Sequence, residues 1–209
     1  MDQEQPKDWS NSLNKIDEPN TDKFSFLEFI WDLVKTAVIV LIIAFGIKYF
    51  LIQPFIVDGN SMLPNFENNE YLLVEKITYR FHEPARGDVI VFHPPGQASD
   101  NYIKRIIGLP NETVEIKDNT VTIFNSDHPS GIVIDEPFIP SDFETLADQP
   151  DMKYKIGLNE YFVLGDNREH SSDSREWGVL PKDNIIGRSW LNIYPFKNFG
   201  VIKHQSFSL

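Results

Sequence analysis

The pattern of hydrophobic and polar residues changes abruptly near Pro54. Residues 1–24 are polar, rich in Asp and Asn, and have no apolar period, which predicts a disordered tail. The apolar stretch that follows, taken from Phe29 to Ile52, is long enough for a helix to cross a bilayer. We therefore expect a single membrane anchor over residues 25–53, ended by Pro54.

Two other interpretations of this apolar stretch stay open. The small-x-small spacing of Ala44 and Gly46 suggests a cleaved signal peptide, but the apolar run continues past it and a long polar tail precedes it. The stretch also fits a buried helix of a soluble core. The three lysines of the tail favour a cytoplasmic N-terminus under the positive-inside rule. On that basis we expect a single-pass protein of the cell membrane with its main domain on the extracytoplasmic face.

Beyond Pro54 the hydrophobic period becomes two. Short runs of Val, Ile, Phe and Tyr alternate with polar residues and are separated by Gly, Pro, Asn and Asp, which predicts strands. The predicted strand regions are 70–77, 87–94, 101–109, 112–124, 131–139, 160–167 and 185–196.

These runs predict a mainly β fold, with antiparallel sheets forming a small barrel-like domain over residues 54–209. Residues 117–160 are expected to form a smaller, variable β or loop region. Within it, Pro140 to Glu160 is polar and contains proline, so we expect a loop there.

Composition excludes several classes of function. A net charge of -12 argues against a nucleic-acid partner, because phosphate binding needs a concentrated basic surface. The chain has no cysteine, which excludes disulfides, zinc ribbons and thiol catalysis. The five histidines lack metal-ligand spacing, and no P-loop or dinucleotide fingerprint is present. We therefore expect neither a metal nor a cofactor.

Three stretches carry candidate chemistry. In "VDGNSMLPNF" a serine, Ser61, follows a tight turn, although turn residues alone account for such a composition. In "NYIKRIIGL" strand alternation places Lys104 on one face with Tyr102 and Ile106. If that face is buried, desolvation lowers the lysine pKa and yields a neutral amine, which can accept a serine proton. The alternatives are an ordinary exposed lysine, or a triad built on His93 or His170.

The third stretch is "YFVLGDNREHSSDSREWGVLP", residues 161–181. It packs serines, an aspartate and an arginine into a few positions after an apolar strand. Such a set suits a hydrogen-bonded loop that holds another side chain in place, and it equally suits a solvated polar loop.

Taken together and in order, these stretches resemble the type I signal peptidases. The matching segments are "PFIVDGNSMLPNF", "EYLLVEKITYRF", "RGDVIVFHPP", "YIKRIIGLPNETVEI" and "YFVLGDNREHSSDSREWGVLP", followed by "IIGRSWLNIYPF". The resemblance extends from the anchor to the C-terminus. It implies a membrane-anchored serine endopeptidase with a serine/lysine dyad, which removes signal peptides from exported pre-proteins. Cleavage would follow small-x-small sites such as Ala-x-Ala, and the implied partners are pre-proteins and the lipid bilayer.

The resemblance also implies roles for individual residues. Ser61 would attack the scissile carbonyl, Lys104 would be the general base, and the Ser171 hydroxyl would orient the lysine amine. Asp173 and Arg175 resemble a salt-bridged support of that loop. The implied structural shell is Arg105, Gly165, Asp166 and Asn167. The implied substrate-binding residues are Phe55, Val57, Leu72 and Ile103.

One position departs from part of the family. Some members have a serine two residues before the nucleophile, and its hydroxyl supplies the second oxyanion donor, whereas this chain has Gly59. The backbone N–H of Ser61 would supply one donor, and the second is left unassigned. Two alternatives also remain: a self-cleaving regulator of the related serine/lysine fold, and an inactive anchored β domain that binds peptides. The first normally carries a DNA-binding head, where this chain has an acidic tail.

Overall fold

The computed structural model describes residues 26–140, 143–147 and 152–204, with the backbone alone at 47–50. The predicted tail, residues 1–24, lies outside the described residues. The chain divides into two compact units, Met1–Ala44 and Phe45–Leu209.

Helix α1 spans Phe26–Phe50, and its segment Phe26–Gly46 has a mean hydropathy of 2.1 over 21 residues. No part of its most apolar window is buried inside the protein, so length and composition suit it to cross a membrane. The helix ends before Pro54, which lies within strand β1, Ile52–Ile56. The prediction that Pro54 ends the helix was therefore wrong. Among the described strands β1 pairs only with β2, and an edge strand tolerates a proline.

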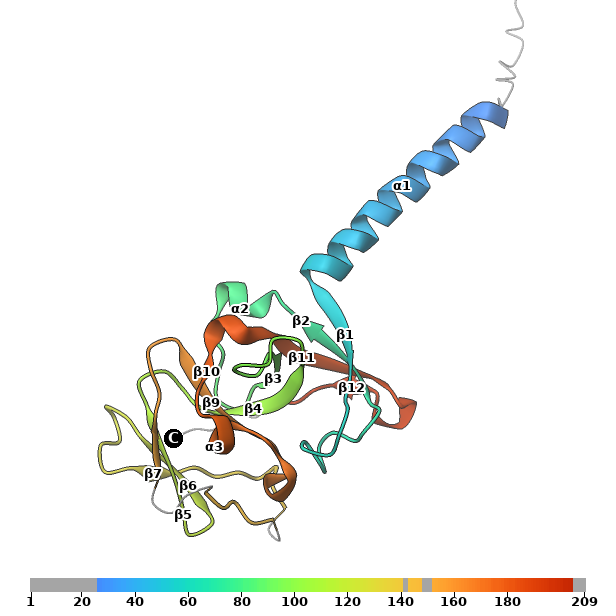
Figure 1. Cartoon of the computed structure of the whole chain (residues 1–209). Helices are drawn as coiled ribbons and strands as arrows, with labels where there is room; N and C mark the ends of the chain where they lie inside the picture. The colour runs from blue at the N-terminus through green and yellow to red at the C-terminus, as the bar shows by residue number, and fades with distance from the viewer. Residues whose placement is uncertain (1–25, 141–142, 148–151, 205–209) are drawn as a thin grey trace, which may run out of the picture. The chain divides into compact units, whose positions relative to one another are not determined.

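The main sheet has eight antiparallel strands in the order β1-β2-β11-β3-β4-β9-β10, with β12 paired to β11 (Figure 1). Its central strand β11 has register shifts at Ser189/Leu191 and Asn192/Tyr194. Such bulges bend a strand and increase its twist, so the sheet curls into a half-barrel. The other strands are β2 Tyr71–Glu75, β3 Val89–Phe92, β4 Tyr102–Gly108, β9 Glu160–Leu164, β10 Leu180–Pro181, β11 Ile185–Tyr194 and β12 Gly200–Val201.

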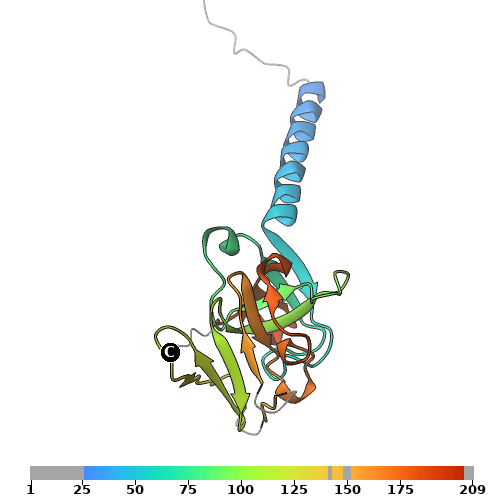
Figure 2. The same cartoon turned by 60° about the vertical axis from the view of Figure 1, so that its left-hand side comes forward.

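A second sheet has four strands in the order β7-β6-β5-β8 (Figure 2). They are β5 Thr113–Lys117, β6 Thr120–Phe124, β7 Ile132–Val133 and β8 Lys153–Lys155. Strand β8 falls inside the predicted loop from Pro140 to Glu160, so that prediction was wrong at this point. Only its central residue Tyr154 is buried, and one apolar residue between two lysines is too weak an alternation to indicate a strand.

Helix is scarce, as the sequence predicted. Besides α1, the described chain contains two short α-helices and three single 3₁₀ turns. They are α2 Thr78–Phe81, α3 Ser174–Trp177, η1 Arg168–His170, η2 Lys182–Asn184 and η3 Phe196–Asn198.

Strand β9 joins two hydrophobic cores. Tyr161 and Val163 pack into the core of the main sheet, whereas Phe162 and Leu164 pack with the four-stranded sheet. All four side chains are fully buried. Because both faces of β9 are covered, the loop that follows it starts from a rigid position.

A third core lies beneath the segment between β1 and β2. Val57, Met62 and Phe66 from this segment pack with Leu72 of β2 and Val89 of β3. Met62 is 1% exposed, so the residue next to Ser61 is fixed in the interior.

A buried ion pair connects the two sheets and yields a prediction of stability. Arg86 Nη2 lies 2.6 and 2.8 Å from the Glu112 carboxylate oxygens, and Glu112 also accepts from the Leu109 N–H. Glu112→Ala leaves the buried guanidinium without its carboxylate, so the free energy of unfolding should fall by about 3–5 kcal/mol. Urea unfolding of the detergent-solubilised protein measures this change.

The control is Glu115→Ala, which removes an ion pair whose lysine partner, Lys153, is exposed. An exposed pair contributes about 1 kcal/mol or less, so Glu115→Ala should change stability little. Equal losses in the two variants would contradict the predicted importance of the buried pair.

Candidate active site

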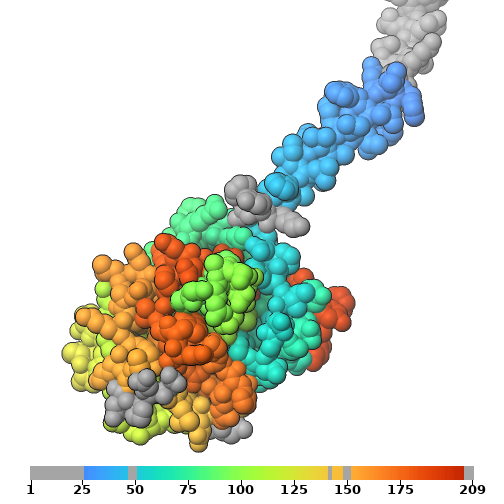
Figure 3. Space-filling model, in the orientation of Figure 1, coloured from blue at the N-terminus to red at the C-terminus, as the bar shows by residue number. Residues whose placement is uncertain are grey.

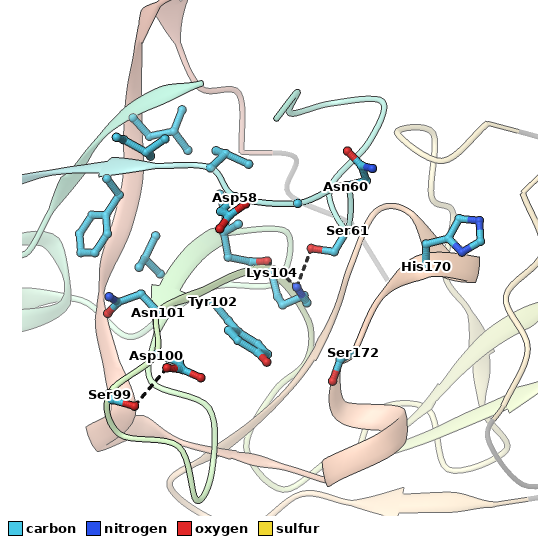
Figure 4. Close-up of a pocket in the computed structure, with 17 residues that line it drawn as sticks. Asp58, Asn60, Ser61, Ser99, Asp100, Asn101, Tyr102, Lys104, His170 and Ser172 are labelled. Atoms are coloured by element: carbon cyan, nitrogen blue, oxygen red, sulfur yellow. Dashed lines mark hydrogen bonds between the residues drawn. The ribbon is translucent and has the colours of Figure 1, made fainter. Parts of the chain in front are cut away.

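The structure brings Ser61 and Lys104 together although they lie 43 residues apart. Ser61 lies in the segment after β1 and Lys104 in β4, and Lys104 Nζ is 2.8 Å from Ser61 Oγ (Figure 4). The amine also donates to the Ile103 carbonyl oxygen at 3.0 Å. Within the described residues neither His93 nor His170 bonds to Ser61, so the histidine-based triad is not formed.

The Lys104 amine is desolvated. Its side chain is 3% exposed, and burial lowers its pKa from an ordinary 10.5 to about 8. The carboxylates of Asp173 and Asp166 oppose this shift, while the Arg175 guanidinium assists it. About one amine in ten is therefore uncharged at pH 7, and this form is able to accept a proton.

The backbone conformation around Ser61 places this residue at the edge of the third hydrophobic core. Gly59 has φ +99°, a conformation that favours glycine, and its N–H donates to Asn68 Oδ1 at 2.9 Å. Val57 on one side and Met62 on the other are buried. The turn between these two anchors lifts the Ser61 hydroxyl toward Lys104.

Asn167 holds the same turn from the loop after β9. Its N–H donates to the Ser61 carbonyl oxygen at 3.0 Å, and its side-chain Nδ2 donates to the Asn60 carbonyl oxygen, also at 3.0 Å. These two bonds fix the peptide groups on both sides of Ser61. The position of the Ser61 hydroxyl thus depends on the position of the 165–167 loop.

Asp166, in that loop, pairs with Arg105, the residue after Lys104. The carboxylate receives Arg105 Nε at 2.8 Å and Nη2 at 2.6 Å, and both side chains are buried. Asn65 Nδ2 adds a third donor at 2.9 Å. This bidentate pair fastens the loop after β9 to strand β4.

Asp173 fastens the other end of the loop. Its carboxylate accepts from the Gly165 N–H at 3.0 Å and pairs with Arg175, whose Nε lies at 2.8 Å. Asp173 also caps helix α3. Arg175 in turn donates to the Arg168 carbonyl oxygen at 2.6 Å, which closes the loop on itself.

Within the described residues Ser171 is not hydrogen-bonded to the lysine. Its hydroxyl is buried and makes no hydrogen bond within the described part of the chain. A Cβ on Gly165 would lie 2.2 Å from that hydroxyl, so Ser171 packs directly against the loop. The orienting role implied for Ser171 remains a prediction.

A groove of about 610 Å³ runs past Ser61. The four residues implied to bind substrate, Phe55, Val57, Leu72 and Ile103, all line it. One wall is the segment around residues 55–61 and the other is residues 99–104, which appear as cyan and green patches in Figure 3.

Several lining or supporting residues were missed from the sequence. Asn65 reaches Asp166 across 101 residues, and Arg168 pairs with Glu136 across 32 residues. No local pattern marks partners so far apart along the chain. Further missed residues of the groove are Asp58, Asn60, Val91, Asp100 and Ser172.

A serine hydroxyl hydrogen-bonded to a desolvated amine, on a mainly β scaffold, has the chemistry of a serine peptidase that uses lysine as its base. Comparison with known proteins agrees with this class. The family model described as "Signal peptidase, peptidase S26" matches residues 30–194.

Among curated relatives, signal peptidase I of Leptolyngbya laminosa is 37% identical over 177 residues, which cover 80% of this chain and 81% of that protein. Signal peptidase I S of Bacillus subtilis strain 168 is 36% identical over 183 residues, or 83% of this chain and 92% of that protein. A crystal structure of a signal peptidase I from Enterococcus faecalis V583 covers 51% of this chain and 97% of its own, at 29% identity and a TM-score of 0.41. The family assignment therefore depends on the sequence matches.

The chain belongs to the type I signal peptidases of peptidase family S26. It is a serine endopeptidase that removes signal peptides, and pre-proteins are its substrates.

The crowding around Gly165 yields a prediction for this site. A Cβ there would lie 2.5 Å from the Ser61 carbonyl oxygen, which is backbone and cannot rotate away. Gly165→Ala should displace the turn that carries Ser61 and lower kcat/KM on the order of 100-fold, since a shift of about 1 Å has such an effect. Pre-protein cleavage assays measure this loss.

Gly200→Ala is the matched control, because a Cβ on Gly200 meets nothing within 4 Å. Thermal melting of both variants checks that each is folded. Full activity in a folded Gly165→Ala variant would contradict the predicted displacement of Ser61.

Proposed function

We propose that Ser61 is the nucleophile and Lys104 the general base with which this peptidase cleaves signal peptides after small-x-small sites. The observation that supports this most strongly is the 2.8 Å hydrogen bond between a serine hydroxyl and an amine whose pKa is about 8. General-base catalysis requires both the contact and the uncharged amine.

In the acylation step, uncharged Lys104 takes the proton from Ser61 Oγ as the oxygen attacks the scissile carbonyl carbon. The resulting ammonium returns that proton to the leaving nitrogen as the carbon–nitrogen bond breaks, which releases the mature protein. The signal peptide remains as an ester on Ser61. Lys104 then takes a proton from water, the water oxygen attacks the ester carbonyl, and Ser61 regains its proton.

Negative charge develops on the carbonyl oxygen of the tetrahedral intermediate. The Ser61 N–H is our candidate for the first donor to this oxyanion. Gly59 has no side chain to supply a second donor, and we assign that donor to no residue.

The neighbouring residues would hold Ser61 and Lys104 in position relative to each other. Asn167 holds the backbone of Ser61, and the Arg105–Asp166 pair ties its loop to the strand of Lys104. Asp173 and Arg175 brace the far end of that loop. Ser171 would complete the support by orienting the amine once substrate is bound.

The walls of the groove suit an extended substrate. In the part of the chain that the structure describes, strand β1 pairs only with β2, and β9 pairs with β4 only from Arg105 onward. There the backbone of β4 at Tyr102–Lys104 is therefore paired on one side only. A substrate strand that joins these edges would point alternate side chains at the apolar wall of Phe55, Val57, Leu72 and Ile103. Shallow apolar subsites of this kind accept a methyl group and exclude larger side chains.

We further propose a single-pass protein of the plasma membrane, with α1 as its anchor and the catalytic domain on the extracytoplasmic face. Domain boundaries of 25–53 for the anchor and 54–209 for the catalytic domain fit this arrangement, with 117–160 as its smaller variable region. The exposed aromatic residues of the C-terminal region are candidates for contact with the bilayer surface. They are Trp190, Tyr194, Phe196 and Phe199.

Substitutions in the dyad test the assigned roles. Ser61→Ala and Lys104→Ala should each lower cleavage of an Ala-x-Ala pre-protein by more than about 1000-fold. Lys104→Arg should not restore activity, because a guanidinium stays protonated. Substantial cleavage by folded Lys104→Ala would show that another group is the base. No cleavage by the folded wild-type protein would favour a non-enzymatic peptide-binding domain.

The pH dependence follows from the Lys104 pKa of about 8. Below this pKa the amine is protonated and cannot act as a base, so kcat/KM should fall about tenfold per pH unit under acid conditions and level off above about pH 8. The pH profile of kcat/KM on a fluorogenic peptide measures this. A profile that stays flat between about pH 6 and pH 9 would contradict a titrating amine.

The proposed orientation is testable because the chain contains no cysteine. Asp118→Cys places one thiol on the exposed turn between β5 and β6. In spheroplasts a membrane-impermeant maleimide should label this thiol without lysis, whereas Ser12→Cys in the tail should react only after lysis. The opposite labelling pattern would reverse the orientation.

A further inference from the structure

Two exposed carboxylates line the active-site groove. Asp58 lies three residues before Ser61, and Asp100 lies just before strand β4. Both are exposed, and neither forms an ion pair within the described residues. The Asp100 carboxylate accepts one hydrogen bond, from Ser99 Oγ at 3.1 Å.

Other acidic residues near the dyad differ in this respect. Asp166 is paired with Arg105 and Asp173 with Arg175, and both of these carboxylates are buried. Their charge is therefore neutralised locally, whereas Asp58 and Asp100 present theirs to whatever enters the groove.

The basic side chains that line the groove are Lys104 and His170. Lys104 must be uncharged to act as a base, so it supplies no positive charge in the active form. His170 lies on the far side of Ser61 from Asp58 and Asp100 (Figure 4). The side of the groove that holds the apolar wall therefore carries net negative charge when the enzyme is active.

We propose that Asp58 and Asp100 make this peptidase select its cleavage sites by charge. The inference rests on the proposed function, in which the first and third residues before the cut face the apolar wall. In an extended chain the middle residue of the small-x-small site then points away from that wall, toward the solvent-facing mouth of the groove, where the exposed carboxylates of Asp58 and Asp100 lie. A basic middle residue is favoured there and an acidic one is disfavoured.

The effect acts through space and requires no direct contact. Charges in an open groove interact over about 8 Å at physiological salt, and an exposed pair changes an equilibrium by about two- to fivefold. With two carboxylates, we expect kcat/KM to differ about tenfold between a lysine and a glutamate at the middle position at low salt.

The test uses the full-length protein in neutral detergent and three peptides that differ only at the middle residue, Ala-Gln-Ala, Ala-Lys-Ala and Ala-Glu-Ala. The expected order of kcat/KM is Lys, then Gln, then Glu. In the double variant Asp58→Asn/Asp100→Asn the Lys-to-Glu ratio should approach one. The wild-type ratio should shrink as salt rises, because screening weakens exposed charges.

The matched control is Asp118→Asn, which removes the same charge from an exposed turn of the four-stranded sheet and should preserve the wild-type ratio. A wild-type ratio near one, or a ratio unchanged in the double variant, would overturn the charge selection while leaving the proposed function intact. Failure of wild type to cut the neutral Ala-Gln-Ala peptide would overturn the proposed function itself.

Discussion

The site depends on the burial of one amine. A fall in the pKa of Lys104 from 10.5 to about 8 means that the charged form is disfavoured by about 3 kcal/mol. Lys104 is buried because strand β4 lies inside the main sheet, between β3 and β9. An exposed lysine at the same place in sequence would stay protonated near neutral pH and could not remove a proton from serine.

The carboxylates that hold Ser61 and Lys104 in place oppose the effect of burial on the Lys104 pKa. The loop after β9 is fastened by Asp166 and Asp173, and both carboxylates raise the Lys104 pKa. Each is paired with an arginine, Arg105 or Arg175, and the Arg175 guanidinium lowers the Lys104 pKa, which partly offsets the two carboxylates. The ion pairs therefore fix the loop that holds the Ser61 backbone, and the Arg175 guanidinium also helps to lower the Lys104 pKa.

The two cores on either side of β9 explain why this loop is a firm support. Tyr161 and Val163 anchor one face of the strand and Phe162 and Leu164 the other, so the Gly165–Asn167 turn begins where both sheets are packed. Met62 and Val57 fix the opposing turn in a separate core. Ser61 and Lys104 thus lie between rigid elements, whereas Asp58 and Asp100 are exposed in the groove and form no ion pair within the described residues.

The sequence by itself determined the class of fold, the apolar helix and the identity of the dyad candidates. Period-two runs predicted the longer strands, because alternation along a strand needs only local information, and the Lys104 face was predicted from the same alternation. The lysine pKa and the pairing of Asp166 with Arg105 and of Asn65 with Asp166 were decided by tertiary structure. These contacts join residues up to 101 positions apart, and burial is a property of the packed sheets. No local pattern in the chain encodes either.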